Sequence, residues 1–170
     1  MTDEFATLER TKDGGLIRFE RAFPNPIEDV WSALTDPERL ADWWPPFATN
    51  VHVDLQEGGT MSFDWPDGPQ LEFRFLRIVP PTLLEHTHTS PGSWMRYELT
   101  ATDDGTLLRA TYFVPEPDEA IERGDVVGAH YGFDRLEAAL AHHPAPLDIE
   151  AFTVLQKRYA EQGLASAPQG

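Results

Sequence analysis

Three histidines are the residues of this chain best able to do chemistry, because imidazole binds metals and moves protons near neutral pH. His86 and His88 stand two residues apart in a segment that alternates like a β-strand, so both rings should lie on one face. A register slip of one residue would turn both toward solvent. With His130 they could offer three nitrogens to zinc, but no carboxylate at suitable spacing completes such a site. We therefore predict no metal and no cofactor.

The same histidines are the candidates for a catalytic base. His86, His88 and His130 titrate in the right range for general acid–base catalysis, although the sequence names no partner for any of them. The commoner role of such residues is hydrogen bonding inside a cavity. No Gly-x-Ser-x-Gly, His-Glu-x-x-His, phosphate-loop or dinucleotide motif occurs, so the catalytic residues stay unknown.

Many aromatic side chains should lie on the same face of the predicted strands as these histidines. The strand face shared with Leu84 and Leu99 should turn toward the long C-terminal helix. Aromatic walls with a few polar tips suit an apolar ligand, whereas the alternative is that the same side chains fill a solid core. The predicted ligand-binding residues are Trp43, Trp44, Phe63, Trp65, Phe73, Phe75, His86, His88, Tyr97, Tyr112, His130 and Phe133.

Composition narrows the possible partners. Of the 170 residues, 13 are Lys or Arg and 29 are Asp or Glu, which gives a formal charge of 13 − 29 = −16. Such an acidic surface repels nucleic acid and anionic membranes, so we expect neither as a partner. There is no cysteine, which excludes disulfides and thiolate chemistry. The start of the chain lacks the apolar segment of a secretory signal, so we expect a cytoplasmic protein.

The elements that must position these residues follow from hydrophobic spacing. Alternation predicts a strand over residues 16–23, and Asn25 with Pro26 predicts the start of a short helix that ends before Asp36. A second short helix should run from Pro37 to about Trp44. Six alternating segments then predict six more strands up to residue 112. Helical spacing begins near Asp118 and is clearest over residues 125–141.

These elements predict one domain over residues 15–143. Residues 1–14 form a partly flexible lead-in, and residues 144–170 form an extension with a short amphipathic helix capped by Asp148 and a disordered tail after Gly163. A sheet with one apolar face needs a cover, which only the long helix can supply. We predict an α+β helix-grip fold: a curved, seven-stranded antiparallel sheet wrapped around the C-terminal helix.

Six segments together carry a resemblance to a known family: residues 21–26, 30–40, 43–44, 51–59, 79–84 and 132–136. They resemble the START-like, or SRPBCC, superfamily, in the branch related to the activator of the heat-shock chaperone ATPase. The resemblance implies a helix-grip fold with a cavity for lipids, aromatic polyketides or other apolar molecules between sheet and helix. It does not imply one activity, since members include carriers, cyclases, hydrolases and chaperone partners.

Three functions stay open. The first is a binding protein for a small apolar or aromatic molecule. The second is a cyclase- or hydrolase-type enzyme that uses a cavity histidine on a hydrophobic substrate. The third is a chaperone-associated interaction module with an exposed apolar patch over residues 43–47 or on the last helix. A homodimer is possible in each case.

Overall fold

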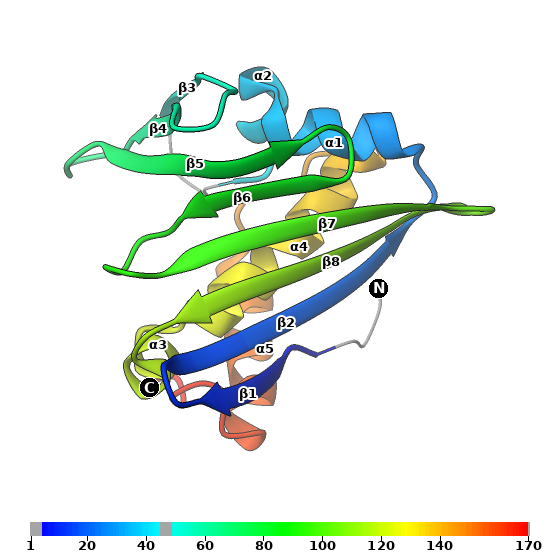
Figure 1. Ribbon diagram of the computed structural model, residues 1–170. Helices are drawn as coiled ribbons and strands as arrows, with labels where there is room; N and C mark the ends of the chain where they lie inside the picture. Colours follow the sequence, from blue (N-terminus) through cyan, green and yellow to red (C-terminus); the bar gives the residue numbers. More distant parts are fainter. Residues whose placement is uncertain (1–4, 45–48, 170) are drawn as a thin grey trace.

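A computed structural model of the protein describes residues 5–44 and 49–169. One curved antiparallel sheet holds all eight strands in the order β1-β2-β8-β7-β6-β5-β4-β3 (Figure 1). The strands are β1 (Thr7–Thr11), β2 (Gly14–Phe23), β3 (Thr49–Val53), β4 (Thr60–Asp64), β5 (Leu71–Val79), β6 (Leu83–Thr87), β7 (Trp94–Thr102) and β8 (Gly105–Val114). The helices are α1 (Ile27–Thr35), α2 (Pro37–Leu40), α3 (Pro117–Arg123), α4 (Asp125–Leu140) and α5 (Ile149–Glu161).

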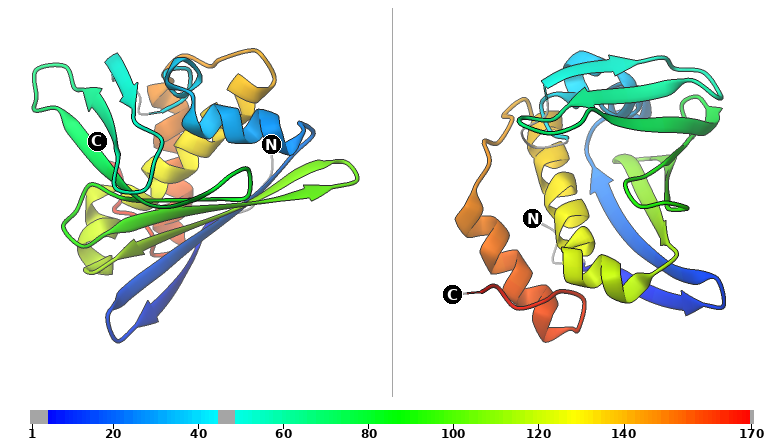
Figure 2. Two further views of the ribbon diagram at one scale, coloured as in Figure 1. Left: turned by 45° about the horizontal axis from the view of Figure 1, so that its top comes forward. Right: turned by 90° about the vertical axis from the view of Figure 1, so that its left-hand side faces the viewer.

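Helix α4 lies across the concave face of the sheet, and α5 packs on the far side of α4 (Figure 2). Alternate residues of β2 point into this interface and are buried, as their sequence pattern requires. Phe19 of β2 meets Phe133 of α4 with ring centroids 5.1 Å apart. Burial of such facing side chains holds sheet and helix together. The predicted antiparallel sheet and covering helix are confirmed.

The sheet has eight strands, so the predicted count of seven is wrong. The additional strand, β1, lies in the segment predicted as a lead-in, and its residues pair with β2 from Thr7–Arg18 to Thr11–Gly14. Four of its five side chains are exposed, so its sequence carries no alternating apolar signal. Backbone hydrogen bonds to the edge of β2 are what form it.

Two helix ends also differ from the predictions. Pro26 rather than Asn25 is the cap residue of α1, while the Asn25 amide donates to Asp29 Oδ2 (2.8 Å) and to the carbonyl of Leu140 (3.0 Å). Asn25 thus ties the start of α1 to the end of α4. Helix α2 ends at Leu40 instead of near Trp44, and turns carry the two tryptophans.

The C-terminal extension is ordered further than predicted. Asp148 caps α5 as expected, since its Oδ1 accepts from the Ala151 N–H at 3.0 Å. Beyond the helix the chain turns back, and the Leu164 N–H donates to the Tyr159 carbonyl at 2.9 Å. Leu164 and Ala165, expected in a disordered tail, pack against the core. Among the described residues, no helix is long and apolar enough to cross a membrane.

Candidate functional site

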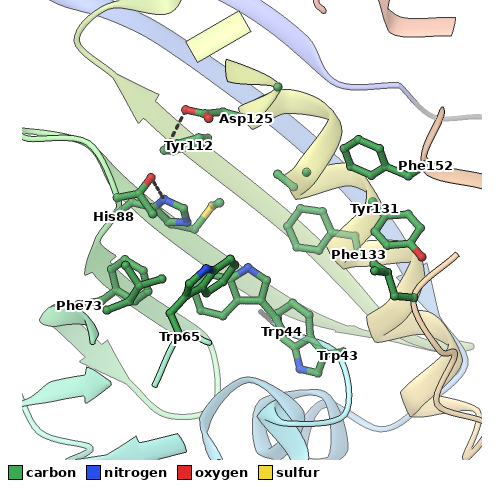
Figure 3. Close-up of a pocket in the computed structure, with 18 of the residues that line it drawn as sticks. Trp43, Trp44, Trp65, Phe73, His88, Tyr112, Asp125, Tyr131, Phe133 and Phe152 are labelled. Atoms are coloured by element: carbon green, nitrogen blue, oxygen red, sulfur yellow. Dashed lines mark hydrogen bonds between the residues drawn. The ribbon is translucent and has the colours of Figure 1, made fainter. Parts of the chain in front are cut away.

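A cavity of about 450 Å³ lies between the inner face of the sheet and α4. Its walls come from the turn after α2, from the segments after β4 and β6, from β5, β7 and β8, from α4, and from the start of α5 with the residues before it (Figure 3). They consist mainly of aromatic and aliphatic side chains. The lining residues are Trp43, Trp44, Trp65, Leu71, Phe73, His88, Thr89, Met95, Tyr97, Tyr112, Gly124, Asp125, Gly128, Ala129, Tyr131, Gly132, Phe133, Leu147, Ile149 and Phe152.

Small residues on α4 create this space. Asp125, Gly128, Ala129 and Gly132 follow one another at helical spacing and share the face toward the cavity. A Cβ added at Gly128 would meet no atom within 4 Å, and one at Gly132 would lie 3.5 Å from Cδ1 of Trp44. A helix with larger side chains on this face would fill the hollow. The cavity therefore depends on the identity of these residues.

Trp44 is the centre of the aromatic wall. Its ring centroid lies 5.2 Å from that of Phe63, 5.5 Å from Phe73 and 5.9 Å from His88. Trp43 is only 2% exposed, and its Nε1–H donates to the Ala33 carbonyl at 2.8 Å. The two tryptophans thus belong to the core and the cavity. The predicted exposed patch over residues 43–47 is wrong for Trp43 and Trp44, and its other members lie outside the described residues.

His86 and His88 both point inward, as the strand parity predicts. Their rings stack 5.9 Å apart at 21°, but only His88 lines the cavity. His86 is fully buried, with Nδ1 2.6 Å from the Thr87 carbonyl. A carbonyl only accepts, so Nδ1 carries the proton and Nε2 is an acceptor, which has no partner among the described residues.

Both imidazoles are neutral at physiological pH. Burial lowers the pKa of His86 to about 4. Burial, and then the proximity of His86, lower the pKa of His88 to about 3. Burial also raises the pKa of the Tyr97 hydroxyl well above its ordinary value, so Tyr97 stays protonated. His88 and Tyr97 therefore add no charge to the cavity wall.

Polar groups gather at one end of the cavity. The Tyr112 hydroxyl donates to Asp125 Oδ2 at 3.2 Å (Figure 3). Arg123 donates to the same oxygen at 2.8 Å. His88 Nδ1 lies 3.2 Å from the Thr89 hydroxyl. Burial, and then the charge of Asp125, raise the pKa of Tyr112 to about 12. This end can orient a ligand through hydrogen bonds.

His130 lies away from this cavity. Its Nδ1 is 2.7 Å from the Tyr159 hydroxyl on α5, and its Nε2 is 3.5 Å from Asp134. Burial, and then the charge of Arg21, lower its pKa to about 3. His130 instead lines a second hollow of about 580 Å³, which also contains the charged side chains of Asp134 and Arg135. The three histidines considered together as zinc ligands do not meet, and the described residues hold no cluster of three potential metal ligands.

Of the twelve side chains predicted to bind a ligand, eight line the cavity. These are Trp43, Trp44, Trp65, Phe73, His88, Tyr97, Tyr112 and Phe133. Phe63, Phe75 and His86 are buried behind that wall, since they pack against Trp44, Phe73 or each other. With His130 they make four residues that the structure places outside the lining.

The sequence reasoning missed other lining residues. Asp125, Gly128 and Gly132 carry a readable signal, which is a run of short side chains at helical spacing along the helix. Leu147, Ile149 and Phe152 carry none. They reach the cavity because α5 folds back on α4, where the Asp148 N–H donates to the Tyr131 hydroxyl at 2.7 Å and Phe152 packs edge-on against the Tyr131 ring at 5.6 Å.

Comparisons with known proteins agree with this architecture. The sequence model of one family, described as Activator of Hsp90 ATPase homolog 1-like protein, matches residues 24–141. CalU16 from Micromonospora echinospora has a similar structure, with 23% identity, a TM-score of 0.75, and coverage of 97% of this chain and 100% of that one. EF2215 from Enterococcus faecalis, a conserved protein of unknown function, shows 21% identity, a TM-score of 0.76, and coverage of 95% and 92%.

A third similar structure, protein MLL2253 from Mesorhizobium loti, shows 26% identity and a TM-score of 0.63, with coverage of 75% of this chain and 97% of that one. No curated protein matches the chain. The family match ends at residue 141, before the segment that contributes Leu147, Ile149 and Phe152. One wall of the cavity is thus built from residues outside the family match.

Proposed function

Since the chain belongs to the family of Activator of Hsp90 ATPase homolog 1-like proteins, within the SRPBCC superfamily, we propose that it binds an apolar or aromatic small molecule in the cavity between sheet and α4. Domains of this kind often bind hydrophobic ligands. The observation that carries the proposal is the hollow itself, which persists beneath a tightly packed aromatic wall because Gly128 and Gly132 leave it open.

The size and lining of the cavity support a compact ligand. Its 450 Å³ equals about fifteen water volumes at ~30 Å³ each, which suits a molecule of two or three fused rings. Burying about 300 Å² of apolar ligand surface would contribute about 7 kcal/mol before the entropic cost of association is subtracted. Micromolar binding needs about 8 kcal/mol net, so the apolar lining must be supplemented by hydrogen bonds from the polar groups of the cavity.

The histidines favour binding over proton transfer. A general base works best when its pKa lies near the working pH. His88, the one histidine on the cavity wall, has a pKa of about 3 and is a weak base. Orienting a ligand through a neutral imidazole is the role that this environment supports. An enzyme of the cyclase or hydrolase type would need a stronger base in the same place.

A pair of tryptophan variants tests the proposal. Trp65 lines the cavity and is 37% exposed, so Trp65→Ala should weaken binding with little loss of stability. Trp94 stacks on Phe113 with ring centroids 5.5 Å apart, does not line this cavity, and provides the matched control in Trp94→Ala. Native mass spectrometry of freshly purified protein would detect a retained ligand, and titration with the neutral dye Nile red would measure affinity.

We expect wild type and Trp94→Ala to bind the dye alike, and Trp65→Ala to bind it about tenfold more weakly, which corresponds to ~1.4 kcal/mol. Absence of dye binding and of any co-purified ligand in the wild type would argue against the proposal. So would equal affinities of all three proteins.

A further inference from the structure

The cavity is chemically two-sided. Tryptophan and phenylalanine rings form most of its wall, and the polar groups of Asp125 and Tyr112 lie together at one end (Figure 3). His88 lies between the two regions, with its ring 5.3 Å from that of Phe73. The rings of His88 and Tyr112 lie 4.7 Å apart, and Tyr112 donates to Asp125, so these three residues form one continuous polar corner. A ligand that fills the cavity must meet this corner.

Asp125 is the strongest acceptor in the corner. Its Oδ2 already accepts from Tyr112 and Arg123, whereas within the described part of the chain its Oδ1 accepts no hydrogen bond. The side chain of Asp125 is 16% exposed, so little water reaches that oxygen once a ligand fills the cavity. Oδ1 is not among the buried side-chain atoms without a partner, so water can reach it in the free protein. A ligand that displaces this water without offering a donor would lose about 1–3 kcal/mol, which a ligand donor would recover.

Charge balance restricts the nature of that donor. Arg123 lies 2.8 Å from Asp125 and offsets its charge, while the imidazole of His88 is neutral. An anionic ligand would meet the carboxylate of Asp125 on a chain of net charge −16. A cationic ligand would be desolvated beside a carboxylate that already has its ion-pair partner. A neutral N–H or O–H donor avoids both the repulsion of an anion and the desolvation cost of a cation.

We propose that the ligand is an uncharged aromatic molecule with a hydroxyl-type hydrogen-bond donor, and that Asp125 Oδ1 accepts this donor while the rings of the opposite wall hold the aromatic body. This inference rests on the proposed function and adds the chemical class of the ligand. Asp125 is a specificity-determining residue in this arrangement, because a hydrogen bond to a charged acceptor is roughly twice as strong as a neutral one.

A series of bicyclic probes tests the inference on the whole protein. Naphthol, methoxynaphthalene, naphthoate and naphthylmethylammonium share one ring system and differ in donor capacity and charge. In isothermal titration calorimetry at pH 7, the wild type should bind naphthol at least about tenfold more tightly than methoxynaphthalene. A charge-assisted hydrogen bond of ~1.5 kcal/mol implies this difference in affinity. Naphthoate and naphthylmethylammonium should both bind more weakly than naphthol.

Asp125→Asn keeps the shape of the side chain and removes its charge. We expect it to reduce the preference for naphthol over methoxynaphthalene to about threefold or less, as for a hydrogen bond between neutral groups. Asp104→Asn, in the exposed turn between β7 and β8, is the matched control and should keep the wild-type preference. If Asp125→Asn does not fold, as judged by circular dichroism, the wild-type series alone decides.

The outcomes separate the two proposals. Equal affinity of the wild type for naphthol and its methyl ether would overturn the donor inference and leave the binding function intact. Tighter binding of naphthoate or of the ammonium compound would overturn it as well. An unchanged preference for naphthol in folded Asp125→Asn would show that Asp125 does not accept the ligand's hydrogen bond. Failure of every probe to bind would count against both the inference and the proposed function.

Discussion

Enlarging the side chain at Gly128 should stabilise the fold and block ligand binding at the same time. Gly128 lies inside α4, where glycine is less favourable than alanine by about 1 kcal/mol because its backbone loses more entropy on folding. A Cβ there meets no atom within 4 Å, so no steric cost opposes the gain. Gly128→Ala should therefore raise the free energy of unfolding by about 0.5–1 kcal/mol.

A longer side chain adds a second effect. In Gly128→Leu the isobutyl group would enter the cavity and bury part of its surface, for a total stabilisation of about 1–2 kcal/mol. The same group would take up about 100 Å² of the apolar contact area that a ligand would otherwise use. At ~25 cal/mol per Å² this loss is about 2.5 kcal/mol, or roughly a 70-fold weaker affinity.

Thermal unfolding without ligand and dye titration measure the two effects separately. A gain of 1 kcal/mol should raise the melting temperature by about 2–4 °C in a domain of this size. Lys157→Leu, exposed on α5 and outside the cavity lining, adds the same side chain elsewhere and should leave binding unchanged. If Gly128→Leu lowers the melting temperature, the cavity has no room for the leucine side chain. If this variant binds the dye with wild-type affinity, ligands bind elsewhere.

Two further predictions concern stability. The pKa of His86 is about 4, below the ~6.5 of a histidine in the unfolded chain. As the pH falls, the unfolded chain therefore binds the proton first, which favours unfolding. The contribution of His86 to the free energy of unfolding is complete above about pH 6.5 and should decrease by about 2 kcal/mol by pH 5. Urea unfolding at pH 7 and pH 5 checks this, and the same loss in His86→Phe would contradict it. Tyr159→Phe removes the acceptor of the Ala6 N–H (2.8 Å) and the partner of His130, and should cost about 1–3 kcal/mol. Hydrogen exchange at the Ala6 amide should then become faster, and unchanged protection there would refute this role of Tyr159.

The inward direction of the site residues could be predicted because strands alternate strictly. Once Leu84 and Leu99 define the buried face, alternate residues of each strand must share it. Tyr97 and Tyr112 are buried there, and His88 lines the cavity beside Tyr112. Whether an inward-pointing side chain lines the cavity or lies behind its wall could not be predicted in the same way. Phe63 and Phe75 have the parity of Phe73 but lie behind it, because distance from the cavity depends on sheet curvature and on the position of Trp44.

The placement of His130 failed for a related reason. Helical spacing puts it on a buried stripe of α4, but α4 is covered on two sides, by the sheet and by α5. Burial alone does not show whether a residue of α4 contacts the sheet or α5. The Tyr159 hydroxyl, 29 positions away in sequence, decides that His130 faces α5.

The sequence by itself determined the antiparallel sheet, the covering helix and the family. These features follow from alternation and helical spacing, which are properties of short segments. The cavity is a property of the space between elements. It exists because Gly128 leaves open space on α4, because Gly132 is small enough to lie against Trp44, and because Leu147, Ile149 and Phe152 fold back to close one side. No single segment contains that information, so only the tertiary structure decided where the hollow is and which groups point into it.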